Sequence, residues 1–420
     1  MSIVVDTDGD GFYDDKKSGA FQDWMGQFLY ASPSNYLDAG EFAGLTQIVD
    51  ETGDGKLDVN LTTAGSSAVI NGAIFTDAVN VGSGTGNYNT FLAVQDQTGG
   101  EVPQDYFEQG FNSNDKNPLD GTNDEIDPSK TETILLGAIP IKIINGVAYY
   151  EFRVDLNESN SAPDTQISLD QFKLYTSSSG TIESTDDLFA SQLRYDMDAG
   201  SDISVLLSEA NSSGSGNDDY AVLVPVDNFS GLNPATTYVY LWVQMGAADG
   251  SSGSSTSPWG VDGGFEEWNL QNAVIVQGHK YIDLDGDGVK DPEDVGQAGV
   301  TIYIDDDLDG IVEDTDGNGQ LDAGEQSTET DSNGHWSFGG LPVYDTTYTV
   351  KIREEVPSGY LGTTQTSDEY GPYVEVTISN QAVAGSILTA PSLFNHPLTP
   401  SFVLDKSIVS VVGGVELESG

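Results

Sequence analysis

The chain has 420 residues, with 68 acidic residues against 14 lysines and arginines and a formal net charge of −54. A field of this sign repels nucleic acid and anionic lipid, which excludes both as partners, and it attracts cations that would offset the self-repulsion of the folded chain. Cysteine is absent, which excludes disulfides and thiolate metal sites, whereas 37 % hydrophobic and 10 % aromatic residues are enough for folded domains.

Residues 1–60 predict a small helical segment between two calcium-binding loops. Apolar residues recur at helical spacing from Ala20 to Leu29, and a weaker helical pattern runs from Phe42 to Val49. In each loop, oxygen-bearing residues recur at every second position and a glycine stands at the sixth, as in loops that surround Ca²⁺ with oxygen ligands. The predicted ligands, counting the carbonyl at position seven, are Asp6, Asp8, Asp10, Phe12 and Asp14 in the first loop and Asp50, Thr52, Asp54, Lys56 and Asp58 in the second.

Both N-terminal loops depart from the full pattern at position twelve, which is Lys17 in the first and Leu61 in the second. The arrangement resembles the paired loop–helix units of dockerins, and the missing acids are where it differs from them. No secretion signal is visible, because the segment from Met1 to Asp6 reaches acidic residues at once. Either a signal is removed before Met1 or export uses another signal. No apolar run is long enough for a transmembrane helix.

Residues 61–275 predict a β-sandwich. Strand-like runs extend from Ile134 to Ile144 and from Val147 to Val154, joined by an Asn-Gly turn typical of hairpins. Further apolar runs at 220–226 and 238–245 alternate with loops rich in Gly and Ser, as in a two-sheet fold. The strings EQGFNSN at 108–114, SLDQFKLY at 168–175, YDMDAG at 195–200 and GGFEEW at 263–268 resemble an uncharacterised domain of large bacterial surface proteins, over about residues 68–272. That resemblance implies a secreted setting and brings no catalytic residues.

Three more calcium loops are predicted within residues 276–395. The loops at 283–294 and 314–325 are complete, although the first ends on aspartate where glutamate is usual. A loop at 305–316 overlaps the second of these, which predicts either two ions that share a ligand or one occupied site beside a decoy. The predicted ligands are Asp283, Asp285, Asp287, Val289, Asp291, Asp294, Asp305, Asp307, Asp309, Ile311, Glu313, Asp314, Asp316, Asn318, Gln320, Asp322 and Glu325. Ligands that are all oxygens favour calcium over zinc.

Residues 276–395 also resemble the SdrD B-like, or Cna-B-type, β-sandwich repeat. The matching strings are YIDLDGDGVKD at 281–291, GVTIY at 299–303, DTDGNGQLDAGE at 314–325, TDSNGHWSF at 330–338 and YTVKI at 348–352. The resemblance implies a calcium role for the loops at 283–294 and 314–325, and the extra loop at 305–313 is the main departure. It also implies a rigid spacer in cell-surface adhesins and stalks.

Two further features belong to this resemblance. Relatives of the fold can join a lysine and an asparagine in an isopeptide bond, and Lys280 and Asn395 lie near the two ends of the repeat. Versions with calcium loops usually lack the bond, so it is not favoured here; loss of ammonia from the intact mass would reveal it. Beyond the repeat, PSFVLDKSIVSVVGG at 400–414 resembles the first strand of another repeat. Its apolar part, Phe402 to Val412, could instead complete a neighbour's sheet.

The expected function is that of a calcium-stabilised extracellular structural protein, a component of a bacterial surface stalk, fibre, matrix or surface layer. Its expected partners are calcium and copies of itself or other matrix proteins. The alternative is an adhesin that binds a glycan or protein through residues 61–275. For a sugar platform, Trp259 is a better candidate than Trp242 or Trp268, because Trp242 lies in an apolar strand.

No enzymatic activity is expected. The three histidines, His279, His335 and His396, are assigned to a strand start, a turn and a linker, with no metal-ligand spacing. Acidic pairs such as Glu266–Glu267 could be hydrolytic, but a solvated edge or minor calcium ligands are the simpler interpretation.

Overall fold

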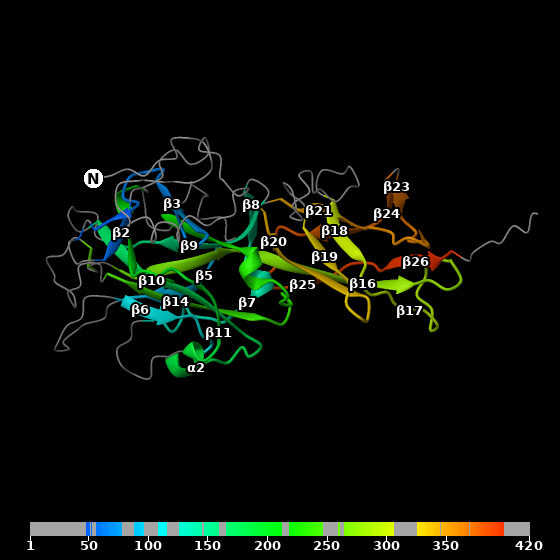
Figure 1. Cartoon of the computed structure of the whole chain (residues 1–420), viewed down its shortest axis with the longest axis horizontal. Coiled ribbons are helices and arrows are strands. Elements are labelled where there is room, and N and C mark those ends of the chain that lie inside the picture. The colour runs from blue at the N-terminus through cyan, green and yellow to red at the C-terminus, as the bar shows by residue number, and fades with distance from the viewer. Residues whose placement is uncertain are drawn as a thin grey trace, which may run out of the picture.

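The computed structural model of the chain describes residues 48–50, 52, 56–77, 88–95, 108–115, 126–144, 147–158, 165–211, 218–246, 259–260, 264–305, 326–344, 346–368 and 370–398. Within these ranges strands dominate, and they form two β-sandwiches placed end to end along the longest axis of the molecule (Figure 1). The prediction of serial, mainly β sandwiches is confirmed. The predicted helix at 20–29 and the predicted strand at 402–412 lie outside the described residues.

The first sandwich consists of two sheets. In the described part of the chain, one sheet has eight strands in the order β1 (Ile48–Val49), β2 (Leu57–Asn60), β12 (Ile203–Ser208), β10 (Gln166–Ser177), β14 (Tyr238–Met245) and β6 (Glu108–Phe111), with β11 (Gln192–Asp196) on β10 and β7 (Ile134–Leu135) on β14. The facing sheet has seven described strands, β3 (Ser67–Ile70), β4 (Ala73–Asp77), β13 (Tyr220–Pro225), β9 (Val147–Asp155), β15 (Glu266–Gln271) and β5 (Tyr88–Val94), with β8 (Ile141–Ile144) on β9. Only β2 and β12 pair in parallel among these strands.

Aromatic rings fill the space between the two sheets. Phe172 of β10 packs edge-on against Phe75 and Phe152 from the facing sheet, at centroid distances of 6.0 and 5.8 Å, and lies 5.4 Å from Trp268 of β15. Such contacts contribute beyond the burial of area, because the edge of one ring is attracted to the face of the next. The alternation of inward apolar residues along each strand therefore builds one continuous core.

Short helices occur between the strands of the first sandwich. They are η1 (Leu136–Ala138), α2 (Thr185–Phe189), η2 (Glu209–Asn211) and η3 (Val226–Phe229). Ser184 caps α2, since its hydroxyl accepts the backbone N–H of Asp187. From α2, Phe189 packs edge-on against Trp242 of β14 at 5.2 Å, so this helix closes the outer face of the eight-stranded sheet there.

Two sequence-based predictions about the first sandwich are wrong in detail. The predicted strand from Ile134 to Ile144 is divided into β7, η1 and β8, because η1 turns away from the sheet toward the second sandwich. The helical pattern predicts a helix up to Val49, but Ile48 and Val49 form strand β1, which pairs with β2. The hairpin of β8 and β9 is present as predicted.

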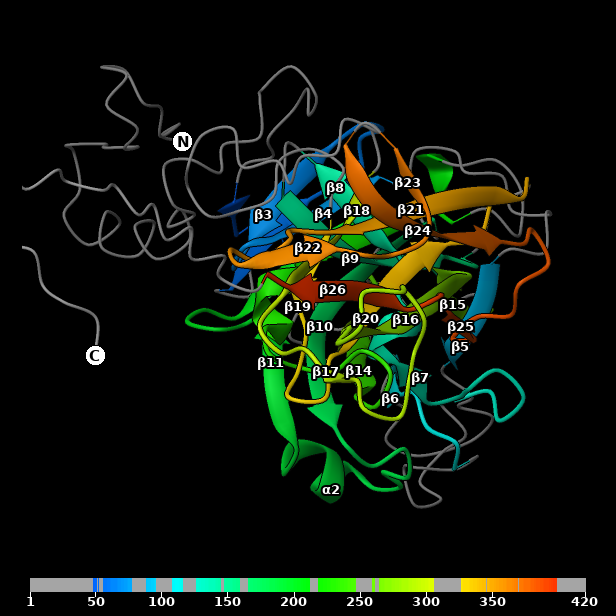
Figure 2. The ribbon, with the colours of Figure 1, turned by 90° about the vertical axis from the view of Figure 1, so that its right-hand side faces the viewer.

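The second sandwich begins directly after the first. Among the residues described, one of its sheets has six strands, ordered β17 (Val295–Gly296), β16 (Ala273–Ile282), β26 (Leu393–Pro397) and β22 (Tyr360–Gly362), with β20 (His335–Pro342) and β25 (Ile387–Thr389) also on β16. The other, of five described strands, is ordered β19 (Ser327–Glu329), β18 (Thr301–Asp305), β21 (Tyr348–Glu354), β24 (Gly371–Ile378) and β23 (Ser367–Asp368). Figure 2 views the molecule along its length from the side of this sandwich.

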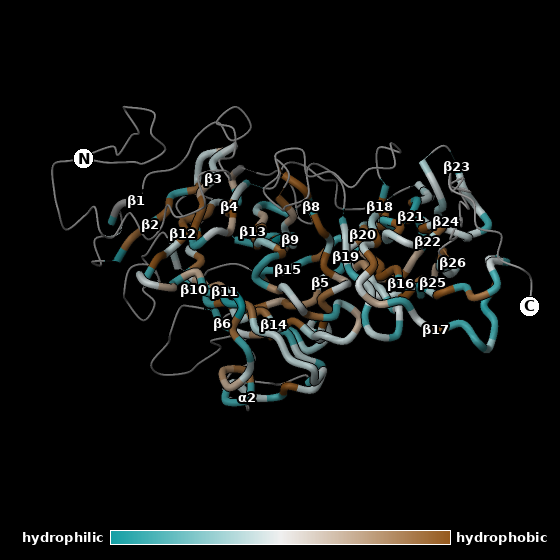
Figure 3. The backbone as a smooth tube through the Cα atoms, turned by 45° about the vertical axis from the view of Figure 1, so that its right-hand side comes forward, coloured by the Kyte–Doolittle hydropathy of each residue, from teal (hydrophilic) through white to brown (hydrophobic). Residues whose placement is uncertain are grey.

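The first and last strands of the second sandwich lie side by side. Strand β16 pairs with β26 in parallel, with Lys280 opposite Leu393 and Ile282 opposite Asn395. A separate apolar core, which includes Val276, Trp336 and Ile352, fills the space between its two sheets. The hydrophobic colour of Figure 3 accordingly follows the strands of both sandwiches.

The two sandwiches meet without a linker. Strand β15 ends at Gln271 and β16 begins at Ala273, and the N–H of Val343 donates to the carbonyl of the intervening Asn272 at 2.7 Å. Backbones touch across the junction, because a Cβ added to Gly339 would lie 2.6 Å from Cα of Gly137. The absence of side chains at these glycines lets η1 press directly onto β20.

Candidate functional site

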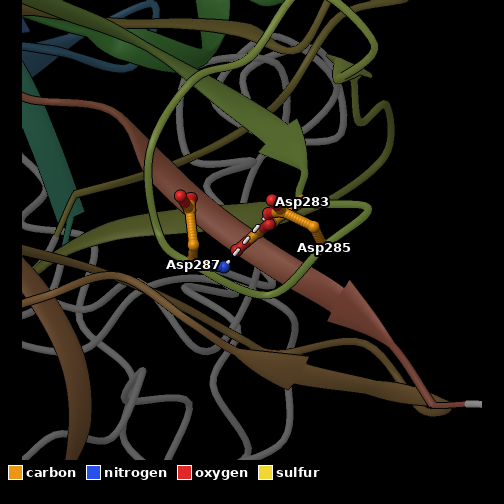
Figure 4. Close-up of side chains that lie close together, drawn as sticks. All are labelled: Asp283, Asp285 and Asp287. Carbon is orange, nitrogen blue, oxygen red and sulfur yellow. Dashed lines mark hydrogen bonds between the residues drawn. The ribbon is translucent and has the colours of Figure 1, made fainter.

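The acidic loop at 283–294 follows β16 at the end of the second sandwich that is away from the first (Figure 1), and Figure 4 shows three of its side chains. One carboxylate oxygen from each of Asp283, Asp285 and Asp287 lies within 4.8 Å of the other two. Gly286 and Gly288 hold φ values of +77° and +72°, the left-handed region that glycine occupies without strain. The glycine predicted for position six is therefore required by the local backbone.

Asp283, at position one, organises the interior of this loop. Its two carboxylate oxygens accept the N–H groups of Gly286 at 2.7 Å and Gly288 at 2.9 Å, and the hydroxyl of Thr363 also donates to it. Burial acts to raise the pKa of Asp283, but these hydrogen bonds outweigh it and hold the pKa below its usual value. The side chain is therefore fixed as a carboxylate, the form that binds a cation.

Asp294, at position twelve, closes the loop. Its oxygens accept the backbone N–H of Leu284 at 3.0 Å and that of Asp291 at 2.9 Å. The pKa of Asp291 is raised by partial desolvation and by the charges of Asp285, Asp287 and Asp294. Carboxylates that raise one another's pKa are crowded together, and an all-oxygen donor set of this kind fits a hard divalent ion such as Ca²⁺. Val289, predicted to ligate through its carbonyl, donates its N–H to Asp287 at 2.8 Å.

The other predicted loops are only partly described. Asp305 ends β18, where its buried carboxylate accepts the Nε–H of Arg353, so it already neutralises a buried guanidinium. In the second N-terminal loop, the carboxylate of the buried Asp58 accepts the N–H of Thr52 at 2.8 Å, and Lys56 forms an ion pair with Asp202. Asp50 is exposed. The ligands predicted at 1–47, at Asp54 and at 306–325 lie outside the described residues, and all these metal assignments stay predictions.

A second group of functional side chains lies in the core beside this loop. Lys280 of β16, Glu354 of β21 and Asn395 of β26 are all buried. The Nζ of Lys280 donates to Oε1 of Glu354 at 2.8 Å, and the Nδ2 of Asn395 donates to Oε2 of the same carboxylate at 2.8 Å. One glutamate thus bridges an amine and a carboxamide that belong to the first and last strands of the sandwich.

The backbone fixes both ends of this triad. The N–H of Lys280 donates to the carbonyl of Gly334 at 2.7 Å, and its own carbonyl accepts the N–H of Gln297 at 2.9 Å. The carbonyl of Asn395 accepts the N–H of Asp283 at 2.9 Å. The acidic loop is therefore bonded directly to the residue that supplies the carboxamide.

Burial shifts the pKa values of two members of the triad. It lowers the pKa of Lys280 to about 8, against the opposing charge of Glu354. It raises the pKa of Glu354, against the hydrogen bonds from Lys280 and Asn395. Both shifts favour the neutral forms, a free amine and a protonated acid.

Neutral partners in this arrangement can react with each other. The amine nitrogen of Lys280 can attack Cγ of Asn395 while Glu354 donates a proton to the carboxamide and accepts one from the amine. A carbon–nitrogen bond forms between the side chains, the original carbon–nitrogen bond of the carboxamide breaks, and ammonia leaves. The reaction needs no further reagent, and the side-chain carboxamide oxygen of Asn395, Oδ1, is buried with no hydrogen-bond partner.

The sequence identified two members of the triad and missed Glu354. The signal for it was present, because Val350, Ile352 and Glu354 alternate on the inward face of β21. A carboxylate in phase with two core residues indicates a buried acid that needs a partner. The identity of that partner depends on the packing of β21 against β16 and β26.

The histidines lie in strands, which corrects their predicted positions. His279 is inside β16, His335 begins β20, and the two are register partners with ring centroids 5.2 Å apart. Burial and the neighbouring His335 lower the pKa of His279. His396 lies in β26, where its Nδ1 donates to the carbonyl of Asp283 at 2.8 Å.

The tryptophans proposed for a sugar platform are largely in the interior. Trp268 is fully buried and Trp242 nearly so, with its Nε1 donating to Gln171 at 2.8 Å. Trp259 is partly exposed, and its carbonyl accepts the N–H of Ser168. Two of the three rings are thus unavailable for stacking on a ligand. No helix among the described residues is long and apolar enough to cross a membrane.

Comparison with known proteins gives similarities to solved structures alone. No family model matches the chain, and no curated protein matches it. The minor pilin GBS52 of Streptococcus agalactiae is 15 % identical, with 63 % of this chain and 96 % of that one covered and a TM-score of 0.20. The shaft pilin SpaA from Lactobacillus rhamnosus GG is 14 % identical (56 % and 90 % covered, TM-score 0.19), and the plantain pollen allergen Pla l 1 is 15 % identical (31 % and 98 % covered, TM-score 0.22). Since these TM-scores are far below 0.5, none of these similarities carries the argument that follows.

Proposed function

We propose that the chain is a calcium-stabilised structural component of a bacterial surface stalk, fibre, matrix or surface layer, in which an isopeptide bond between Lys280 and Asn395 locks the second sandwich. The observation that carries the proposal is the buried triad, in which Glu354 holds the amine and the carboxamide at 2.8 Å each. Buried ionisable groups are costly to keep, and bond formation removes one of them, the amine of Lys280, from titration.

The position of the bond suits a component under tension. Load enters the second sandwich at the start of β16 and leaves at the end of β26, since these are its first and last described strands. A bond from Lys280 to Asn395 would carry that load from one strand to the other. Residues 281–394, which form most of both sheets, would then bear no force.

Calcium has a complementary role in this proposal. An ion held by the loop at 283–294 would fix the end of β16 against β26, because Asp283 is bonded to Asn395 and His396. An ion that binds only the folded state stabilises it by about 2.7 kcal/mol when its concentration is a hundredfold above Kd. Extracellular modules bind calcium at roughly 10⁻⁴–10⁻³ M, which suits an exported protein.

The test is the intact mass of the purified full chain under denaturing conditions. We expect the mass to fall short of the sequence mass by one ammonia, and a digest to contain a branched peptide that joins Lys280 to Asn395. Lys280→Ala and Asn395→Ala should restore the full mass, and Glu354→Gln should leave most of the chain unlinked. Lys290→Ala, which removes an exposed lysine of the acidic loop, is the control and should keep the bond. A wild-type chain of full sequence mass would refute the crosslink.

A further inference from the structure

The first sandwich contains a group of buried glutamates that the calcium-loop pattern does not include. Glu266 is the first residue of β15 and Glu108 the first residue of β6, so they come from opposite sheets of the sandwich. Their side chains interact, and their exposed fractions are 0 % and 1 %. They lie at the end away from the second sandwich, because β15 runs from Glu266 toward the junction at Asn272.

Glu266 lacks the partners that a buried carboxylate requires. Its Oε2 is buried and has no hydrogen-bond partner, and the bond that its Oε1 accepts from the N–H of Asn157 is long, at 3.4 Å. Among the described residues, no lysine or arginine forms an ion pair with it. An uncompensated charge in such a position is strongly destabilising.

A third glutamate adds to the negative charge of this group. Glu209 begins η2, just after β12, and the Oε2 of its carboxylate is also buried without a hydrogen-bond partner. Burial raises the pKa of Glu266 to about 7, opposed by the hydrogen bonds from Glu108 and Asn157, and the charge of Glu209 raises it further. The half-buried Glu209 therefore adds negative charge near the buried pair of Glu108 and Glu266.

We propose that Glu108 and Glu266 bind a calcium ion that closes this end of the first sandwich. The donors are carboxylate oxygens, which hard cations prefer and which disfavour zinc. They arise from strands of two opposite sheets, and Ca²⁺ accepts six to eight oxygens, water included, in irregular arrangements, whereas Mg²⁺ demands near-octahedral geometry. The ion would supply the missing partner of Glu266 and tie β6 of one sheet to β15 of the other.

This site is independent of the proposed crosslink and of the acidic loop, both of which lie in the second sandwich. The sequence pattern of calcium loops does not detect this site, because that pattern requires ligands that are close together along the chain. The string GGFEEW, noted for its acidic pair, contains Glu266 beside Glu267. The two side chains differ, since Glu267 is partly exposed and forms an ion pair with Lys130.

The test compares Glu266→Gln with the matched control Glu267→Gln in the full chain. Calcium binding is measured by equilibrium dialysis and isothermal titration. We expect Glu266→Gln to bind one calcium ion fewer per chain than the wild type, and Glu267→Gln to bind the same number as the wild type. Equal ion counts for the two variants would overturn the proposal.

Thermal unfolding gives a result that a simple loss of packing would not produce. In chelator at pH 8, Glu266→Gln should melt at a higher temperature than the wild type, because it removes an uncompensated buried charge. In millimolar calcium the order should reverse, because the variant lacks the ion. The same order in both conditions would contradict the proposed site.

The wild-type protein provides a measurement that needs no substitution. Hydrogen exchange followed by mass spectrometry should slow on calcium addition in peptides that contain β6 and β15. Magnesium at the same concentration should have little effect. If calcium slows exchange around 283–294 and leaves these peptides unchanged, the ion does not bind in the first sandwich.

Discussion

The two sandwiches bury glutamates to the same depth but surround them with different groups. In the second sandwich, Glu354 lies between the amine of Lys280 and the carboxamide of Asn395, both at 2.8 Å. In the first, Glu266 lies beside Glu108, and one of its oxygens has no hydrogen-bond partner. Desolvation raises the pKa of both carboxyl groups. Burial alone therefore does not determine what a glutamate does. An amine and an amide beside it allow a covalent bond to form between those two groups, whereas a second carboxylate beside it adds negative charge that a bound cation would neutralise.

The largest effect should come from removing the bond in the second sandwich. Closing a loop of about 100 residues stabilises a fold by about 5 kcal/mol in the chain-entropy model, and Asn395→Ala should lose stabilisation of that order. Calorimetry of the full chain should show the transition of the second sandwich at a lower temperature, with that of the first much less changed. A variant that melts like the wild type would show that the triad is not crosslinked.

The next effect concerns buried guanidinium groups, which both sandwiches contain. Arg353 donates to Asp305 and, at 2.7 Å, to Asp368, whereas Arg153 of the first sandwich donates to Glu151 at 2.9 Å. Removal of one partner from a buried pair costs about 3–5 kcal/mol, and Asp305→Ala should destabilise the second sandwich by that order.

The same variant separates two roles of Asp305. Urea unfolding in calcium and in chelator should show the same loss of stability, because the partner of Asp305 is Arg353. A loss confined to calcium would instead establish Asp305 as a metal ligand, as the sequence pattern predicts.

A smaller effect is expected from the acidic loop. Asp287→Asn keeps the oxygen that accepts the N–H of Val289 but removes a charge from the group around Asp283 and Asp285. The calcium-dependent gain in stability of the second sandwich, about 2.7 kcal/mol at a hundredfold excess over Kd, should be reduced. Glu355→Gln, which neutralises an exposed carboxylate of the same sandwich, should leave that gain unchanged. Equal gains in the two variants would argue against an ion in this loop.

Local patterns in the sequence predicted local structure well. The strand at 238–245 has the predicted bounds, and the loop at 283–294 has glycine in the left-handed region at position six. The division of the strand from Ile134 to Ile144 was not predictable, because η1 turns out to press on the second sandwich, a contact between distant segments. The alternation of residues along β21 predicts that Glu354 faces inward. Its contact with Lys280 depends on how the two sheets pack, which the sequence pattern does not show. The same holds for Glu266, whose neighbour Glu108 is distant in the sequence and lies in the opposite sheet.

The smallest expected effect is the dependence of folding stability on pH. It distinguishes an ion pair between Lys280 and Glu354 from a covalent bond between Lys280 and Asn395. The pKa of Lys280 is about 8 in the folded chain, against about 10.5 for an ordinary lysine. Between these values the unfolded chain holds the proton that the folded chain has released, so the stability of a chain without the bond should rise with pH across this window. The gain is at most a few kcal/mol, at about 1.4 kcal/mol for each pKa unit.

Asn395→Ala should show this rise in urea unfolding between pH 8 and 10.5, because its Lys280 keeps a free amine. The wild type should not, since an amide nitrogen does not titrate. A wild-type chain with the same slope as the variant would mean that Lys280 and Glu354 remain an ion pair. The second sandwich would then resemble the first as we propose it, because the charge of Lys280 would stabilise Glu354 as a cation would stabilise Glu266.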